Sequence, residues 1–203
     1  MAPVRGGRPP HGGKLLLFPK KNYHKPSGTR EDMAKNSFLI RTNVTASHTG
    51  EAYAQTELDL GSYTNLGSSK PEVLRIHTAH WFIQDSDGKM PNLGADKAGI
   101  ISWQLCTQSQ SAFVQVTDDS FLMGGQAGVR NPDSSPNPPS QKFAESLMPQ
   151  DLTSGLVVAV PSIFLGAAIG AEFTEDANIG LVLECTTEAM SKANAVALAI
   201  SQQ

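Results

Sequence analysis

The sequence contains few cysteines, and their positions exclude a disulfide framework and a zinc site. Cys106 and Cys185 are its two cysteines; they lie 79 positions apart and form no C-x-x-C pair. Because both lie among apolar residues, we expect buried and unreactive thiols. A chain of 203 residues needs no such support, since a domain of that size buries roughly 70% of the surface that its unfolded chain exposes.

Long apolar runs are also absent. The longest apolar stretch, residues 156–171, is interrupted by Pro161, Gly166 and Gly170, and it falls short of the about 18 apolar residues that a membrane-spanning helix requires. Near the N-terminus the run LLLF ends at Pro19 after four residues, too few for the apolar core of a secretory signal. We therefore expect no membrane span and no secretion.

Acidic residues are missing from residues 1–30. This segment carries a charge of +7, whereas the other 173 residues hold nine basic and 19 acidic side chains, a net charge of −10. The asymmetry predicts a basic N-terminal arm, residues 1–35, that contacts a polyanion or an acidic protein surface, including another copy of the domain formed by residues 36–203. A solvated tail is the alternative, but it does not explain LLLF. The basic residues are Arg5, Arg8, Lys14, Lys20, Lys21, Lys25 and Arg30.

Beyond residue 36, apolar and polar residues alternate in short runs bounded by Gly, Pro, Asn, Asp and Ser. A period of two with β-branched and aromatic residues predicts strands. An eighth strand is predicted at residues 193–202, although its alanines also suit a helix, and residues 141–148 are predicted to be helical. Together these runs predict an all-β fold, an antiparallel eight-stranded jelly-roll sandwich with an extended N-terminal arm. The first seven strands are predicted at residues 37–46, 55–60, 72–85, 98–108, 111–118, 155–165 and 178–188.

The chain has almost no catalytic or metal-binding motif. His77 and His80 are three apart on a predicted strand, where they would point to opposite faces, so we expect ordinary histidines. Residues 85–88, DSDG, lack the spacing of a calcium loop and predict a hairpin turn; residues 124–128, GGQAG, lack the Lys and Ser/Thr of a phosphate loop and predict a plain loop. The sequon at Asn43 lies in a predicted strand and should stay unmodified. We expect no enzyme activity, no metal and no cofactor.

A basic arm with Gly and Pro, followed by eight antiparallel strands within 203 residues, resembles the small single jelly-roll capsid proteins of icosahedral viruses. The resemblance covers the whole chain as an architecture and includes no short signature motif. It implies a structural virion protein that is made in the host cytoplasm, assembles in many copies into a shell and meets other virion proteins there. The arm has three arginines among its seven basic residues, fewer than the arginine-dense arms of many RNA-virus coats, which favours assembly over genome packaging.

In such a shell the apolar run has a role. Residues 14–18 would run extended along a neighbouring subunit, where they cover a sheet edge and place alternate side chains in pockets. The seven basic residues are then candidates to contact the acidic neighbour or the viral nucleic acid. Packing of LLLF against its own sandwich is the alternative. The candidates for the inter-subunit contact are Leu15, Leu16, Leu17 and Phe18.

Charged residues make up 17% of the chain, below the ~25% of a typical soluble domain, which suits a surface buried in interfaces. A second hypothesis is a β-sandwich that binds a carbohydrate or protein ligand on an aromatic platform of Trp81, Trp103, Tyr53 and Tyr63. Both tryptophans lie in apolar strands, where core packing is the more typical use. A regulator that binds DNA or RNA is a third hypothesis, disfavoured by the acidic domain.

Overall fold

The computed structural model describes residues 36–50 and 52–203. The chain divides into two units, Met1–Met33 and Ala34–Gln203, and the described residues belong to the second. Its elements are β1 (Phe38–Ala46), β2 (Ala54–Asp59), β3 (Glu72–Gln84), β4 (Ala98–Cys106), β5 (Phe121–Arg130), β6 (Ser140–Leu147), the 3-10 helix η1 (Pro149–Asp151), β7 (Leu156–Val158), β8 (Ser162–Ile169), β9 (Ala177–Ala189) and α1 (Lys192–Ser201).

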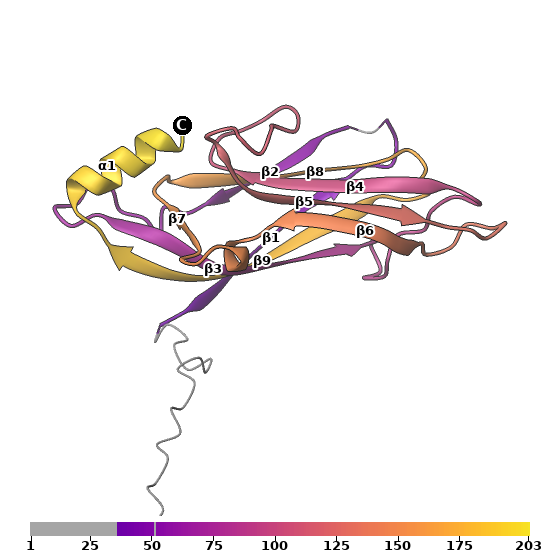
Figure 1. Ribbon diagram of the computed structural model, residues 1–203, viewed down its shortest axis with the longest axis horizontal. Coiled ribbons are helices and arrows are strands. Elements are labelled where there is room, and N and C mark those ends of the chain that lie inside the picture. Colours follow the sequence, from indigo (N-terminus) through magenta and orange to yellow (C-terminus); the bar gives the residue numbers. More distant parts are fainter. Residues whose placement is uncertain (1–35, 51) are drawn as a thin grey trace, which may run out of the picture. The chain divides into compact units, whose positions relative to one another are not determined.

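The strands form two sheets that pack face to face (Figure 1). One sheet has the order β1-β9-β3-β7 and the other β2-β8-β4-β5-β6, and every pairing is antiparallel. With β6 set aside, eight strands remain. β1 pairs with β9, β2 with β8, β3 with β7 and β4 with β5, so the outermost strands in the sequence pair first and the innermost last. Successive pairs alternate between the sheets, which is the winding of a jelly roll. The predicted fold class is confirmed, with nine strands instead of eight.

The core lies between the two sheets and follows the period of two. On β9, for example, Ile179, Leu181 and Leu183 are buried, whereas the residues between them are part-exposed. Trp81 of β3 and Trp103 of β4 meet across the interior, with ring centroids 5.6 Å apart. Each fully buried large aliphatic side chain contributes about 1.5–3 kcal/mol, so the alternating faces supply the main force that holds the sheets together.

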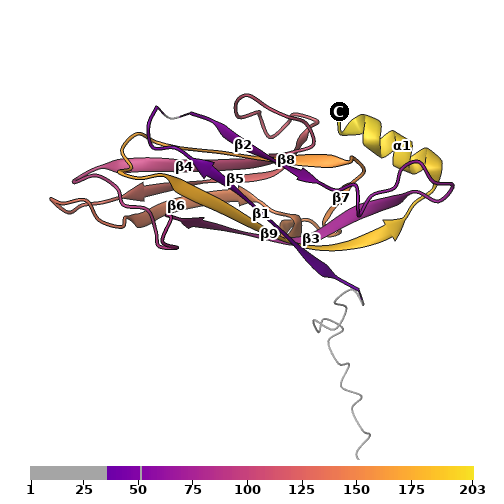
Figure 2. The same cartoon turned by 180° about the vertical axis from the view of Figure 1, so that it is seen from behind.

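The C-terminal segment is a helix, so the predicted eighth strand is wrong. Ser191 caps α1, because its side chain accepts the N–H of Asn194. Ala195 is buried in a small cluster with Val73 and Ala159. The alanines therefore act here through helix propensity. In Figure 2 the helix packs at one end of the sandwich. No helix within the described part of the chain is long and apolar enough to cross a membrane.

Four other sequence predictions are also wrong. Residues 141–148 do not form a helix but belong largely to β6, and residues 124–128 belong to β5. Residues 111–118 lie in the connection between β4 and β5 and not in a strand. Residues 155–165 split into β7 and β8, because the chain crosses between the sheets near Pro161, a residue with no N–H to donate to a ladder.

Candidate functional site

The predicted arm residues lie outside the described residues. They are Leu15, Leu16, Leu17 and Phe18 of the apolar run, and Arg5, Arg8, Lys14, Lys20, Lys21, Lys25 and Arg30 of the basic set. Their roles therefore stay predictions, and the candidate site is built from the surface of the sandwich.

The outer face of the five-stranded sheet carries several glycines. On β5, Gly124 and Gly128 alternate with inward residues, and on β8 Gly166 lies between buried Leu165 and Ala167. Aromatic rings lie over these three glycines. A Cβ at Gly166 would be 1.8 Å from the hydroxyl of Tyr53, so only glycine accepts this close approach.

Two further rings complete the pattern. Phe121 covers Gly124, and Phe143 of β6 covers Gly128, where a Cβ would be 2.0 Å from ring carbon Cε1. Ile100 of β4 pairs with Gly128 on its other side. Ile100 and Phe143 are 51% and 46% exposed, so they flank the glycine as an apolar patch that spans three strands.

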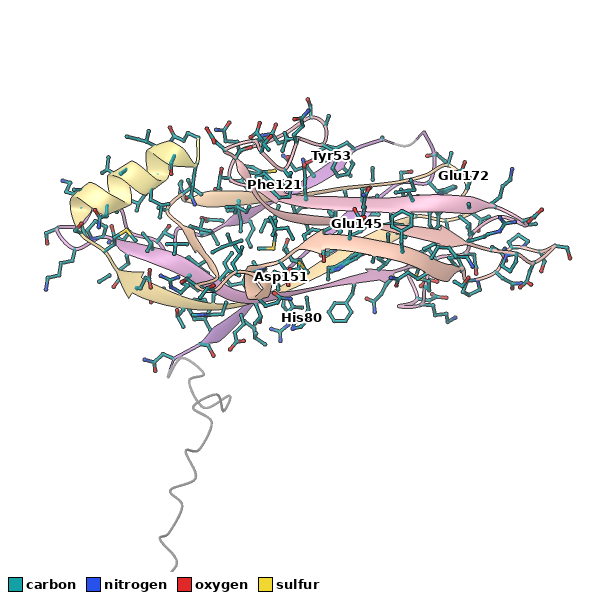
Figure 3. All side chains as sticks on the ribbon, in the orientation of Figure 1. Tyr53, His80, Phe121, Glu145, Asp151 and Glu172 are labelled. Atoms are coloured by element: carbon teal, nitrogen blue, oxygen red, sulfur yellow. The ribbon has the colours of Figure 1, made fainter. Side chains whose placement is uncertain are left out.

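The connection between β4 and β5, residues 107–120, is fixed to this outer face by Gln104. The side-chain amide of Gln104 donates to the Tyr53 hydroxyl at 2.9 Å and to the Ala112 carbonyl at 3.1 Å, and its oxygen accepts the Val114 N–H at 3.0 Å. Gln104 is 1% exposed. Since breaking these bonds would leave buried polar groups unpaired, the connection is held in one position. Figure 3 shows Tyr53 beside it.

This fixed connection presents apolar side chains to solvent. Phe113 is 42% exposed and packs edge-on against Tyr53, at 5.2 Å between centroids, and Val116 is 62% exposed. Two carboxylates follow, Asp118 and Asp119. The Ser120 hydroxyl and N–H both donate to Asp118 and lower its pKa, so this carboxylate stays ionised at neutral pH.

A groove of about 480 Å³ lies between the connection and β6. Phe113, Val116 and Phe121 supply apolar walls, and the floor includes Ser102 and Gly124. Glu145 of β6, labelled with Phe121 in Figure 3, is the one charged residue among those that line the groove. We call this site the outer groove; its shape and charge suit an apolar segment with cationic flanks and disfavour a polyanion.

His77 and His80 do not point to opposite faces of the strand, so the reason given for the histidine prediction is wrong. A β-bulge between Ile76 and Thr78 shifts the alternation of β3. His77 Nε2 lies 2.9 Å from Thr186 Oγ1 on the outer face. His80 is exposed and is labelled on the same outer side in Figure 3. Among the described residues, no group of three or more His, Cys, Asp or Glu could hold a metal ion.

The DSDG segment is a tight turn, as predicted, but not a hairpin between paired strands. The Asp85 carboxylate accepts the N–H groups of Asp87 and Lys89, both at 2.8 Å, and Gly88 has a φ of 79°. The chain then leaves β3 for β4 in the other sheet. Asn43 is exposed on β1, where it pairs with Gly180.

The four predicted platform aromatics do not share a surface. Trp103 is 2% exposed in the core, and Trp81 packs against that core. Tyr63 stacks on Phe38 at 4.9 Å, while Tyr53 lies on the outer face of the five-stranded sheet. Core packing of the tryptophans is confirmed, and a platform built from these four residues is wrong.

Sequence reasoning missed the outer groove and Gln104. The one signal for the groove was the glycine spacing in residues 124–128, which was interpreted as a loop. Nothing in the sequence marked Gln104, because its role depends on residues 107–120 folding back over β4.

Cys106 and Cys185 are buried as expected, and burial raises the pKa of their thiols to about 11 and about 12.

No family model matches the sequence, and no curated protein matches it. Among solved structures, VP1 of human polyomavirus 12 in complex with 3′-sialyllactosamine is 8% identical, with a TM-score of 0.40 over 77% of this chain and 100% of that chain. VP1 of Merkel cell polyomavirus in complex with disialyllactose is 7% identical, with a TM-score of 0.35 over 81% of this chain and 98% of that chain.

Proposed function

We propose that this protein is a self-assembling capsid subunit of a virion, with a structural and not an enzymatic role. The observation that carries the proposal is the jelly-roll winding of eight strands, directly preceded by a basic segment. Jelly rolls are typical of viral capsids, although lectins and cupins share them. The space between the sheets is filled by side chains such as Trp103, Leu105 and Ile163, which leaves the outer faces and edges for recognition.

Exposed apolar side chains on several sides of the sandwich support assembly. The four-stranded sheet presents Leu39 and Phe82, which are 50% and 52% exposed, and helix α1 presents Val196 and Ile200, which are 48% and 67% exposed. The five-stranded sheet adds the patch around Phe143. Apolar surface on three sides suits a subunit that contacts several neighbours.

Within this proposal, the N-terminal arm docks on neighbouring subunits through residues 15–18. Burying four large apolar side chains is worth roughly 6–10 kcal/mol before ordering costs, whereas surface ion pairs contribute about 0–1 kcal/mol each. The apolar run therefore supplies the affinity. The seven basic residues of the arm contact acidic protein surface, packaged nucleic acid, or both.

The second candidate function is a ligand-binding module. The outer groove favours it, because its volume of about 480 Å³ falls in the ~300–1,000 Å³ range of ligand pockets. Its position on an open sheet face suits an extended peptide segment as well as a small ligand.

Electron microscopy and sedimentation velocity on the purified full-length protein test the proposal. A capsid subunit should form closed particles of uniform size that sediment far faster than a single chain. A monomer or small oligomer at every protein and salt concentration would contradict the capsid proposal and favour the ligand-binding module.

A further inference from the structure

The outer groove has the surface chemistry of a docking site for an extended apolar segment. Phe113 and Val116 stay solvent-exposed on a connection that Gln104 holds rigidly in place. Since the walls are already ordered, binding of a segment costs little in ordering the site itself. The floor includes Ser102, whose small side chain leaves room for a main chain to approach the sheet.

The charge around the groove selects the kind of segment. Glu145 lines it, and Asp118 and Asp119 lie on the connection that forms one wall. With carboxylates beside apolar walls, the groove disfavours phosphate groups and favours an apolar segment with lysines at its ends.

One segment of this chain has that chemistry. Residues 15–18 are LLLF, with Lys14 before them and Lys20 and Lys21 after them. In an extended conformation Leu15 and Leu17 point to the same side. Lys14 and Lys20 are six positions apart, roughly 20 Å in an extended chain, so the lysines at the two ends are far enough apart to meet carboxylates beyond the apolar walls.

We infer that residues 14–21 of one copy bind in the outer groove of a second copy, with Leu15 and Leu17 against Phe113 and Val116 and the flanking lysines near the carboxylates. This inference rests on the proposed function, in which the arm docks on neighbours, and it names the surface that receives the arm. Binding of the arm to the groove of its own chain is the competing outcome.

Disulfide trapping in the full-length protein tests the inference. In one preparation, chains with Leu16→Cys are co-expressed with chains with Gln126→Cys, and Gln126 lies on the groove floor. In the control, Gln84→Cys takes the place of Gln126→Cys; Gln84 is an exposed glutamine on β3 of the other sheet. The native thiols are buried, with pKa values raised to about 11 and about 12, so the engineered thiols alone react near pH 8. In an extended arm with Leu15 and Leu17 against the connection, residue 16 would point to the opposite side, toward β5 and β6, so its replacement leaves the two docking side chains in place.

We expect a disulfide between position 16 of one chain and position 126 of another to form at least about tenfold faster than the control link, because docking raises the effective concentration of the two thiols. Mass spectrometry of the linked peptides identifies the pair, and electron microscopy scores particles separately. Normal particles without a preference for position 126 would overturn the groove and leave the capsid proposal standing. Absence of particles from the native protein would overturn the capsid proposal instead. A link within one chain in the Leu16→Cys, Gln126→Cys double variant would overturn docking between copies.

Discussion

Phe143 lies across Gly128 of the neighbouring strand, so closely that a Cβ at Gly128 would be 2.0 Å from ring carbon Cε1. Replacing Gly128 with alanine should swing the ring off the sheet and destabilise the protein by about 1 kcal/mol, the size of a cross-strand pair. Chemical denaturation measures this difference. The matched control is Gly180→Ala on β9, where an added Cβ would meet no other residue within 4 Å apart from its chain neighbours; it should be neutral or stabilising by up to about 1 kcal/mol.

A double variant separates the ring contact from other effects of the substitution. In a Phe143→Ala background, Gly128→Ala should cost little, because the ring that obstructs the new methyl group is gone. An equal cost in both backgrounds would show that Phe143 is not the cause.

Gln104 holds residues 107–120 on the sheet, so Gln104→Ala should release them. We expect a loss of about 1–3 kcal/mol, because the Val114 N–H and the Ala112 carbonyl lose their buried partner. Amide hydrogen exchange at Val114 should accelerate more than exchange in β9. Gln126→Ala, an exposed glutamine on the adjacent strand, is the control, and unchanged exchange at Val114 would contradict the proposed anchor.

Two arm variants compare how much the apolar run and the basic residues of residues 1–35 contribute to assembly. Changing Leu15 and Leu17 to Ser should abolish assembly at any salt concentration, because the apolar contact supplies most of the affinity. Neutralising Lys20 and Lys21 with Gln should cause a mild defect that depends on salt. Sedimentation velocity at low and high salt compares them. If the leucine variant assembled normally and the lysine variant lost its nucleic acid, genome binding would be the arm's main role.

Asp176 contacts His48, and the charge of Asp176 makes a contribution to stability that depends on pH. The His48 backbone N–H donates to Asp176 Oδ1 at 3.0 Å, and the His48 ring Nδ1 lies 2.7 Å from the same oxygen. The backbone bond, followed by the ring bond, lowers the pKa of Asp176. A carboxyl whose folded pKa is lower than its unfolded value of about 3.9 stabilises the fold above that value, and this contribution is lost as the pH falls through the folded pKa.

The variant Asp176→Asn should therefore melt at a lower temperature than the native protein at pH 7, and the difference should shrink below about pH 4. Thermal melts across this range measure it. Asp87→Asn, in the exposed turn after β3, is the control. A difference in melting temperature that is constant with pH would contradict this role of the Asp176 charge.

The sequence predicts those parts of the fold that a period of two controls. β1 and β9 alternate more buried and more exposed residues, so their sides and approximate ends follow from side-chain polarity alone. β5 and β6 do not follow from the sequence. β5 carries three glycines, which are typical of a loop, and β6 is exposed along nearly its whole length, so its side chains show no period.

The candidate site was less predictable for the same reason. Outward residues of a sheet carry no sequence signal until another segment covers them, and the outer groove depends on residues 107–120 returning over β4 and β5. The bulge in β3 had no signal either, since a single extra residue reverses every later side. Composition, by contrast, carries a plain signal, because residues 1–30 are basic and the rest of the chain is acidic.

The tryptophan pair gives the sandwich an optical reporter of its own. Trp81 and Trp103 are the two tryptophans of the chain, one from each sheet, with ring centroids 5.6 Å apart. At that separation the two indoles couple electronically, so near-ultraviolet circular dichroism and tryptophan fluorescence sense the spacing of the sheets. Assembly that left the sandwich intact would leave the tryptophan signal unchanged while light scattering rose. Measuring both signals on one sample would therefore distinguish folding from particle formation.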